Sequence, residues 1–100
     1  MITTEAQKVI DLMVEVSGQS QEAICGQSRQ RPLPTCRWLI ARVLITRMGY
    51  STGLAGAVIG RDHATVLYGI KHLDDYLIQL NNPIERFIAS EFMAKLDGNG

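Results

Sequence analysis

The residue types that could do chemistry gather in one short stretch, residues 60–66, with the sequence Gly-Arg-Asp-His-Ala-Thr-Val. Asp62 can cap a helix, because its carboxylate can accept a hydrogen bond from the free backbone N–H of Ala64 or Thr65. Its charge also suits the positive end of the helix dipole. The residues from His63 onward would form the first turn, which faces base edges in helix-turn-helix proteins. The stretch therefore predicts a helix that enters a DNA groove with its N-terminal end.

Four residues of this stretch have a contact that they could make with DNA. His63 can donate to or accept from a base edge, Ala64 can touch a thymine methyl group, and Thr65 can bond a phosphate. Arg61, directly before the cap, is placed to reach a phosphate or a guanine. The alternative for His63 is a surface or core histidine whose hydrogen bonds are satisfied within the protein.

A second candidate site is the loop of residues 27–34, which carries Arg29 and Arg31. Pro32 and Pro34 exclude a helix in its centre and favour extended backbone before each proline. An extended arm with two arginines suits a phosphate or a narrow, A·T-rich minor groove. The alternative is an ordinary polar loop.

The net charge of the chain is zero, but its charges are separated along the sequence. Residues 24–72 hold seven basic residues against one acid, a balance of +6, and the flanks hold three against nine, a balance of −6. This separation predicts a basic face that binds phosphates and acidic flanks that offer a surface for a protein partner. Arg42 and Arg47 either extend the basic face or only solvate their helix. The alternative is that all these charges merely coat a solvated surface.

Hydrophobic residues recur at helical spacing, so the sequence predicts an all-α fold of about six helices in a single domain, residues 1–100. The expected helices span about residues 5–17, 20–26, 34–48, 52–59, 63–77 and 83–96, with fraying over 97–100. Their expected N-caps are Thr4, Ser20, Ser51 or Thr52, Asp62 and Asn82, and the expected stops of the first four are Gly18, Gly26, Gly49 and Gly60. The expected buried stripe of the last helix is Ile84, Phe87, Ile88, Phe92 and Leu96.

Residues 61–66, Arg-Asp-His-Ala-Thr-Val, resemble the Arg-Asp-His-(Ser/Thr)-Thr-Val signature of the C-terminal DNA-binding domain, domain IV, of the bacterial chromosomal replication initiator DnaA. Residues 28–44 resemble the basic loop and long helix of that domain at nearly the same spacing. The resemblance covers roughly residues 5–95. It implies a helix-turn-helix bundle of the DnaA C-terminal or Trp-repressor-like fold, with the basic loop at 27–34 and the helix-turn-helix at about 51–77.

The resemblance also implies how the site residues act. Arg29 lies where the family places a minor-groove arginine, and Arg31 lies where it has a further basic residue. Arg37 matches an arginine that contacts the DNA backbone. In a helix-turn-helix, backbone N–H groups near Ser51 and Thr52 are the usual phosphate clamp.

The chain departs from the family in three places: Trp38 replaces a common Gln, Ala64 replaces Ser or Thr, and one glycine instead of two precedes Arg61. We expect Trp38 to pack, with a DNA contact as the alternative, and base discrimination at Ala64 to be relaxed or altered. The implied function is sequence-specific binding of double-stranded DNA, at a DnaA-box-like site in replication initiation or its regulation. The alternatives are a standalone transcription regulator of a phage or mobile element, and a protein-interaction adaptor on the same fold.

Other chemistry finds no support in the sequence. The spacing of Cys25, Cys36, His63 and His72 matches no known zinc motif, and the sequence contains no glycine-rich phosphate loop. We therefore expect that the protein binds neither a metal nor a cofactor and is not an enzyme. Each cysteine is expected to be a small buried hydrophobe, with a disulfide or metal role as the alternative. No apolar run approaches the roughly 18 residues of a membrane span, and Glu5 replaces the basic start of a signal peptide. The sequence therefore predicts a cytoplasmic protein that does not bind a membrane.

Overall fold

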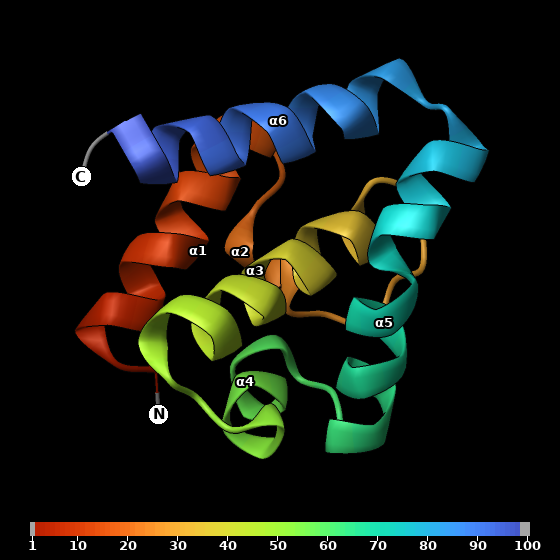
Figure 1. Ribbon diagram of the computed structural model, residues 1–100. Coiled ribbons are helices and arrows are strands. Elements are labelled where there is room, and N and C mark those ends of the chain that lie inside the picture. The colour runs from red at the N-terminus through yellow and green to blue at the C-terminus, as the bar shows by residue number, and fades with distance from the viewer. Residues whose placement is uncertain (1, 99–100) are drawn as a thin grey trace.

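The computed structural model describes residues 2–98, which fold into six α-helices and contain no strand (Figure 1). The all-α prediction is therefore confirmed. The helices are α1 (Thr4–Ser17), α2 (Gln21–Ile24), α3 (Leu33–Met48), α4 (Thr52–Ile59), α5 (His63–Leu80) and α6 (Pro83–Gly98).

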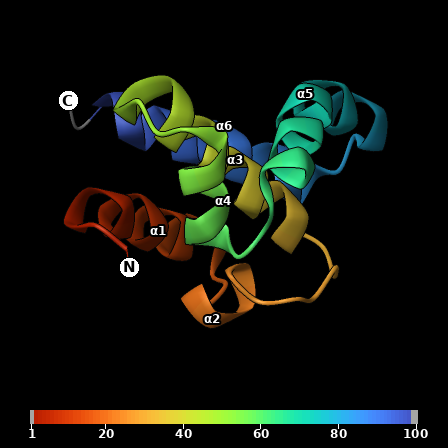
Figure 2. The same cartoon turned by 90° about the horizontal axis from the view of Figure 1, so that it is seen from below.

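Helix α3 crosses the middle of the molecule and packs against each of the other five helices. Its predicted apolar stripe is buried, as are residues on its other faces, so that α3 forms the axis of the core. The stripe residues, each at most 1% exposed, are Leu39, Ile40, Val43 and Leu44. Figure 2 shows α2 and the loop that follows it beyond one end of α4, on the side where α3 begins.

Helix starts and stops follow local hydrogen bonds. The predicted caps Ser20, Ser51 and Asp62 each accept a backbone N–H of the following turn, and Asn82 does the same for α6. The first cap is Thr3 and not the predicted Thr4, because the Thr3 hydroxyl accepts the N–H three residues on.

Three glycines end helices as predicted, since Gly18, Gly49 and Gly60 have φ of 74°, 72° and 71°. Helix α2 ends at Ile24, before the predicted stop at Gly26. At the three glycine stops the signal lies within one turn of the helix end, which is why the sequence shows it.

Two other bounds differ from the prediction. Helix α3 already begins at Leu33, because Pro34 occupies the first turn, where its missing N–H costs no hydrogen bond. Helix α5 continues three residues beyond the predicted end to Leu80, and Asn81 in the left-handed conformation stops it. Helix α6 includes the predicted fraying positions 97 and 98, whereas 99 and 100 lie outside the described residues.

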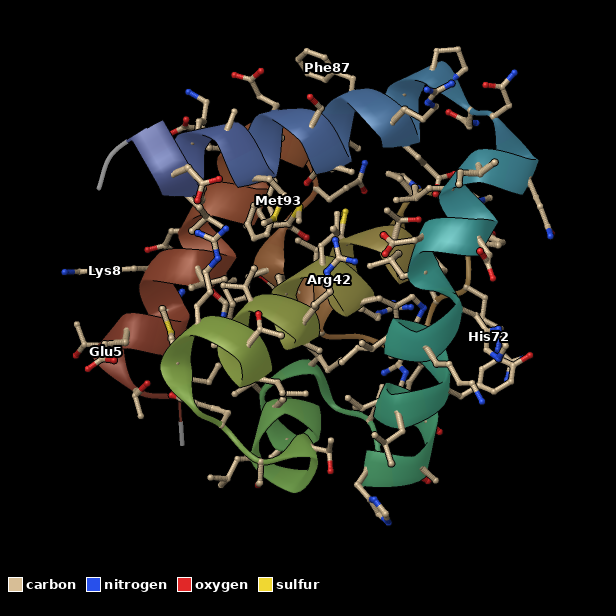
Figure 3. All side chains as sticks on the ribbon, in the orientation of Figure 1. Glu5, Lys8, Arg42, His72, Phe87 and Met93 are labelled. Carbon is tan, nitrogen blue, oxygen red and sulfur yellow. The ribbon has the colours of Figure 1, made fainter. Side chains whose placement is uncertain are left out.

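The buried face of α6 differs from the predicted stripe. Ile84 and Phe87 are 67% and 59% exposed, and Figure 3 shows Phe87 on the outer side of the helix. Glu85 is turned inward in their place and lies on the same side as the buried Ile88 and Phe92. The helix takes this rotation because the Glu85 carboxylate has partners inside the molecule, which are described below.

Candidate nucleic-acid interface

A tight turn joins α4 to α5 and fixes the start of α5. The backbone N–H of Arg61 donates to the Gly56 carbonyl over 2.8 Å, and a Cβ on Gly56 would lie only 2.3 Å from the Arg61 carbonyl oxygen. Gly60 adopts the left-handed conformation that favours glycine. The two glycines, Gly56 within α4 and Gly60 at its end, therefore set the direction in which α5 leaves α4.

The first turn of α5 is built as the sequence predicts. The Asp62 carboxylate accepts the Thr65 N–H over 2.8 Å, and this backbone hydrogen bond lowers the pKa of Asp62 below its usual value. His63, Ala64 and Thr65 are all exposed. The turn therefore presents its polar side chains to solvent on a capped helix end, which carries partial positive charge.

Beside this turn lies a hollow of about 520 Å³, called here the arginine hollow. Its lining comes from the loop after α2, the start of α3 and the start of α5. The lining residues are Gln27, Arg29, Arg31, Pro34, Arg37, Trp38, Arg61 and Thr65. The structure thus brings together five of the ten predicted site residues, and the hollow has no carboxylate in its lining.

Two of these arginines are held by backbone carbonyls. Arg61 donates to the carbonyls of Gly26 and Gly60 over 2.8 and 3.0 Å. Arg37 donates from Nε to the carbonyl of Ile24 over 2.6 Å. Within residues 2–98, neither guanidinium forms an ion pair with a carboxylate. Burial and the nearby charge of Arg61 both lower the pKa of Arg37. The two cations therefore repel each other, and an anion in the hollow would relieve this repulsion.

Arg37 is buried, whereas a side chain that contacts the DNA backbone would be expected on the surface. It is 2% exposed, and its hydrogen bonds to the carbonyls of Ala23 and Ile24 join the end of α2 to α3. The Ile24 carbonyl has no backbone donor because α2 ends there, and the Arg37 side chain satisfies it, while the Ala23 carbonyl also accepts the Gly26 N–H. Arg37 thus forms part of the wall of the hollow and supports the fold, while the contact with the DNA backbone that the resemblance implies stays a prediction.

Arg31, predicted as a further basic residue of the DNA-binding loop, is paired with a carboxylate. It donates from Nε and Nη2 to the two carboxylate oxygens of Glu85, each over 2.6 Å, and its guanidinium lies 4.3 Å from the centre of the Tyr76 ring. The buried Thr35 hydroxyl also hydrogen bonds to Glu85. Burial alone would raise the pKa of Glu85, but the hydrogen bonds from Arg31 and Thr35 and the Arg31 charge lower it overall. We call these four residues the Glu85 cluster.

Two further arginines of the basic segment are paired with acids of the flanks. Arg42 contacts Asp74 over 2.8 Å, and Arg47 contacts Asp97 over 2.6 Å. These ion pairs join α3 to α5 and to α6, so that both arginines contact acids of the flanks. Whether they also extend the basic face stays a prediction. The predicted division into one basic and one acidic face does not hold at these positions, since the fold brings the two segments together.

Ser51 and Thr52 lie apart from the hollow. They stand at the start of α4, and the hollow lies beside the turn at its end, roughly 12 Å away for a helix of eight residues. The Ser51 hydroxyl accepts the Leu54 N–H over 3.1 Å and so caps α4. These two residues would have to contact a different phosphate from the one that the hollow could hold.

The sequence interpretation missed Gln27 and Pro34 as site residues and favoured packing over a DNA contact for Trp38. Trp38 does pack against the core as predicted, but it also lines the hollow. The sequence did contain a signal for Pro34 and Trp38. They are four residues apart on the helix that carries Arg37, so they lie on the same face of that helix. The fold places one face of that first turn against the loop.

Within residues 2–98, no three His, Cys, Asp or Glu side chains are grouped so that they could hold a metal ion. Cys36 is buried as predicted, and burial raises the pKa of its thiol to about 11. Cys25 is only half-buried, and its thiol donates to the Val58 carbonyl over 3.5 Å. Neither cysteine forms a disulfide in the described part of the chain.

The fold and the site define an all-α protein with an arginine-lined hollow beside an exposed, capped helix start. None of the helices within the described range combines the length and the apolar character that crossing a membrane requires. No protein-family model matches the chain, and searches of curated proteins and of solved structures give no match either.

Proposed function

We propose that this protein binds double-stranded DNA sequence-specifically, with α4 and α5 as a helix-turn-helix pair. The observation that carries the proposal is that Arg29, Arg37 and Arg61 line one hollow, without a carboxylate, directly beside the exposed first turn of α5. Phosphate contacts orient a DNA-binding protein, and base contacts provide the specificity. A phosphate site next to a turn with hydrogen-bonding side chains supplies both.

In the proposed complex, the first turn of α5 enters the major groove. His63 bonds a base edge, Ala64 contacts a thymine methyl group, and Thr65 contacts a phosphate. Arg29, which is exposed on the loop, reaches the adjacent minor groove or its phosphates. Arg37 and Arg61 attract the phosphate from the wall of the hollow.

The resemblance of residues 61–66 to the DnaA signature supports a DnaA-box-like target and a role in replication initiation or its regulation. A transcription regulator that uses the same fold would make the same contacts. The experiment below therefore tests the DNA site first, because both roles depend on it.

Fluorescence anisotropy with a DnaA-box duplex and a scrambled duplex of equal length tests this proposal. We expect the wild type to prefer the box, and His63→Ala to lose that preference by roughly 1–3 kcal/mol, the value of a good base contact. Lys71→Ala, exposed further along α5 and outside the hollow, is the matched control. Equal, salt-sensitive binding to both duplexes would refute sequence-specific readout, and absence of binding would favour a protein-interaction adaptor.

A further inference from the structure

A second hollow of about 230 Å³ adjoins the arginine hollow and shares Pro34, Trp38 and Thr65 with it. Its lining is mostly aromatic and apolar, so it is called here the aromatic groove. The residues that line only this groove are Tyr68, Gly69, His72, Leu73 and Tyr76. One continuous surface thus carries cations at one end and aromatic rings at the other.

The groove exists because α5 has a glycine where α3 presents its tryptophan. A Cβ on Gly69 would lie within 2.4–2.7 Å of three Trp38 ring atoms, so the indole lies directly on the backbone of α5. At the rim, the rings of Tyr68 and His72 lie 4.4 Å apart between centroids, and Figure 3 shows His72 on the outer side of α5. Tyr68 is 69% exposed, so a flat ligand can reach its face.

The two hollows together match one kind of ligand. The aromatic groove suits a flat, uncharged ring, since base–aromatic stacking accepts any base with a π-face. The arginine hollow suits an anion of more than one charge, because Arg29, Arg37 and Arg61 surround it without a carboxylate. Their combined size falls within the roughly 300–1,000 Å³ that small-molecule sites occupy.

We propose that this surface binds a nucleoside 5′-monophosphate, with its base in the aromatic groove and its phosphate in the arginine hollow. Thr65 lines both hollows, at the boundary where the sugar would pass. A phosphate suits the hollow better than a carboxylate does, because it can carry two charges and offers three terminal oxygens to separate guanidinium groups.

The ligand would occupy the hollow that the proposed function assigns to a DNA phosphate, so nucleotide and duplex should exclude each other. This competition rests on the proposed function, whereas nucleotide binding itself does not. Binding is therefore measured first without DNA. A failure of DNA binding then leaves the nucleotide site standing, and a failure of nucleotide binding leaves the DNA site standing.

The experiment is a titration with adenosine monophosphate, followed by calorimetry and by the NMR signal of the indole N–H. The chain has a single Trp, so this signal reports on Trp38 alone. We expect a saturable shift at millimolar nucleotide and at least fivefold weaker binding of either adenosine or inorganic phosphate, because each fills only one of the two hollows. Binding of inorganic phosphate as tight as that of the nucleotide would overturn the proposal, as would a lack of any saturable shift. Tighter binding of an aromatic carboxylate, such as indole acetate, would also overturn it.

Two variants test the two halves of the site. Tyr68→Ala should weaken nucleotide binding roughly tenfold by removal of a stacking surface, and Arg29→Ala should weaken it by a similar factor and reduce its salt dependence. Both side chains are exposed, so neither change removes a buried contact. Leu67→Ala, which is 51% exposed on α5 and lines neither hollow, is the control and should bind as the wild type does. Unchanged binding in Tyr68→Ala would overturn the assignment of the base to the groove.

Discussion

Two neighbouring parts of this protein use arginine in opposite ways. In the Glu85 cluster, Arg31 gives its Nε and Nη2 donors to a carboxylate that is 1% exposed. In the arginine hollow, Arg37 and Arg61 donate to backbone carbonyls. A carboxylate neutralises a guanidinium, whereas a carbonyl orients it and leaves its positive charge in place.

This difference indicates which arginines serve the fold and which remain available to an anion. The cluster connects the loop before α3 to α6, elements far apart in sequence, and so its loss should appear in stability. Arg29, Arg37 and Arg61 of the hollow have no carboxylate partner in the described chain, and so the loss of the exposed Arg29 should appear in binding. The predictions below test whether stability and binding separate in this way.

The largest expected effect is on the stability of Glu85→Ala. Breaking a fully buried ion pair costs about 3–5 kcal/mol. The Arg31 side chain is 36% exposed and can regain water, so we expect a loss of about 2–3 kcal/mol in the free energy of unfolding. For a domain of this size, such a loss corresponds to a melting temperature lower by roughly 10 °C or more. Urea unfolding followed by circular dichroism measures it.

The matched control is Asp97→Ala, which removes an ion pair of equal length but with both partners exposed. The Arg47 and Asp97 side chains are 39% and 63% exposed, so this change should cost less than about 0.5 kcal/mol. If the two variants lost equal stability, the Glu85 cluster would not be the special support that its burial indicates.

The stability that the Glu85 charge contributes should depend on pH in a defined direction. The folded protein lowers the pKa of Glu85 below its ordinary value of 4.5, so the folded state holds the charged form more tightly than the unfolded chain does. The contribution is therefore complete above the ordinary pKa and disappears as pH falls through the folded pKa. Unfolding of the wild type and Glu85→Gln at a series of pH values should show a difference at neutral pH that shrinks below about pH 4.5. A difference that grows in acid would contradict the assignment.

The next largest effect is expected for Arg29→Ala, and it concerns DNA binding. Its side chain is exposed, so the free energy of unfolding should stay within about 0.5 kcal/mol of the wild type. Affinity for duplex DNA should fall roughly tenfold, or about 1.4 kcal/mol, and the slope of log affinity against log salt should decrease by about 0.9. Arg86→Ala, equally exposed but bonded to Asn81 away from the hollow, should leave the slope unchanged. An equal decrease in both variants would indicate diffuse attraction instead of a phosphate contact.

The sequence predicted the parts of the molecule that depend on signals within one helical turn. Asp62 and Thr65 are three residues apart, and the left-handed Gly60 lies two residues before Asp62, so the start of α5 follows from local chemistry alone. The same is true of the caps at Ser20 and Ser51.

The parts that the sequence did not predict depend on partners far along the chain. Arg31 and Glu85 are 54 residues apart, and hydrophobic periodicity counts a buried carboxylate as a solvent position, which explains the wrong stripe on α6. Arg37 is a further case, because arginine is rarely buried, and its burial depends on carbonyls at the end of α2, 13 and 14 residues away in the sequence.

The smallest effect is expected for Arg42→Ala. This variant tests most directly whether pairing with a carboxylate separates arginines of the fold from arginines that bind an anion. Arg42 belongs to the basic segment by sequence, yet it contacts Asp74, whose side chain is 76% exposed. Removal of this pair should change the free energy of unfolding by less than about 0.5 kcal/mol. If only arginines without a carboxylate partner bind phosphate, DNA affinity and its salt slope should also remain those of the wild type. A salt slope reduced as much as in Arg29→Ala would show that pairing with an exposed acid does not remove an arginine from the DNA-binding surface, and that the whole basic segment acts together.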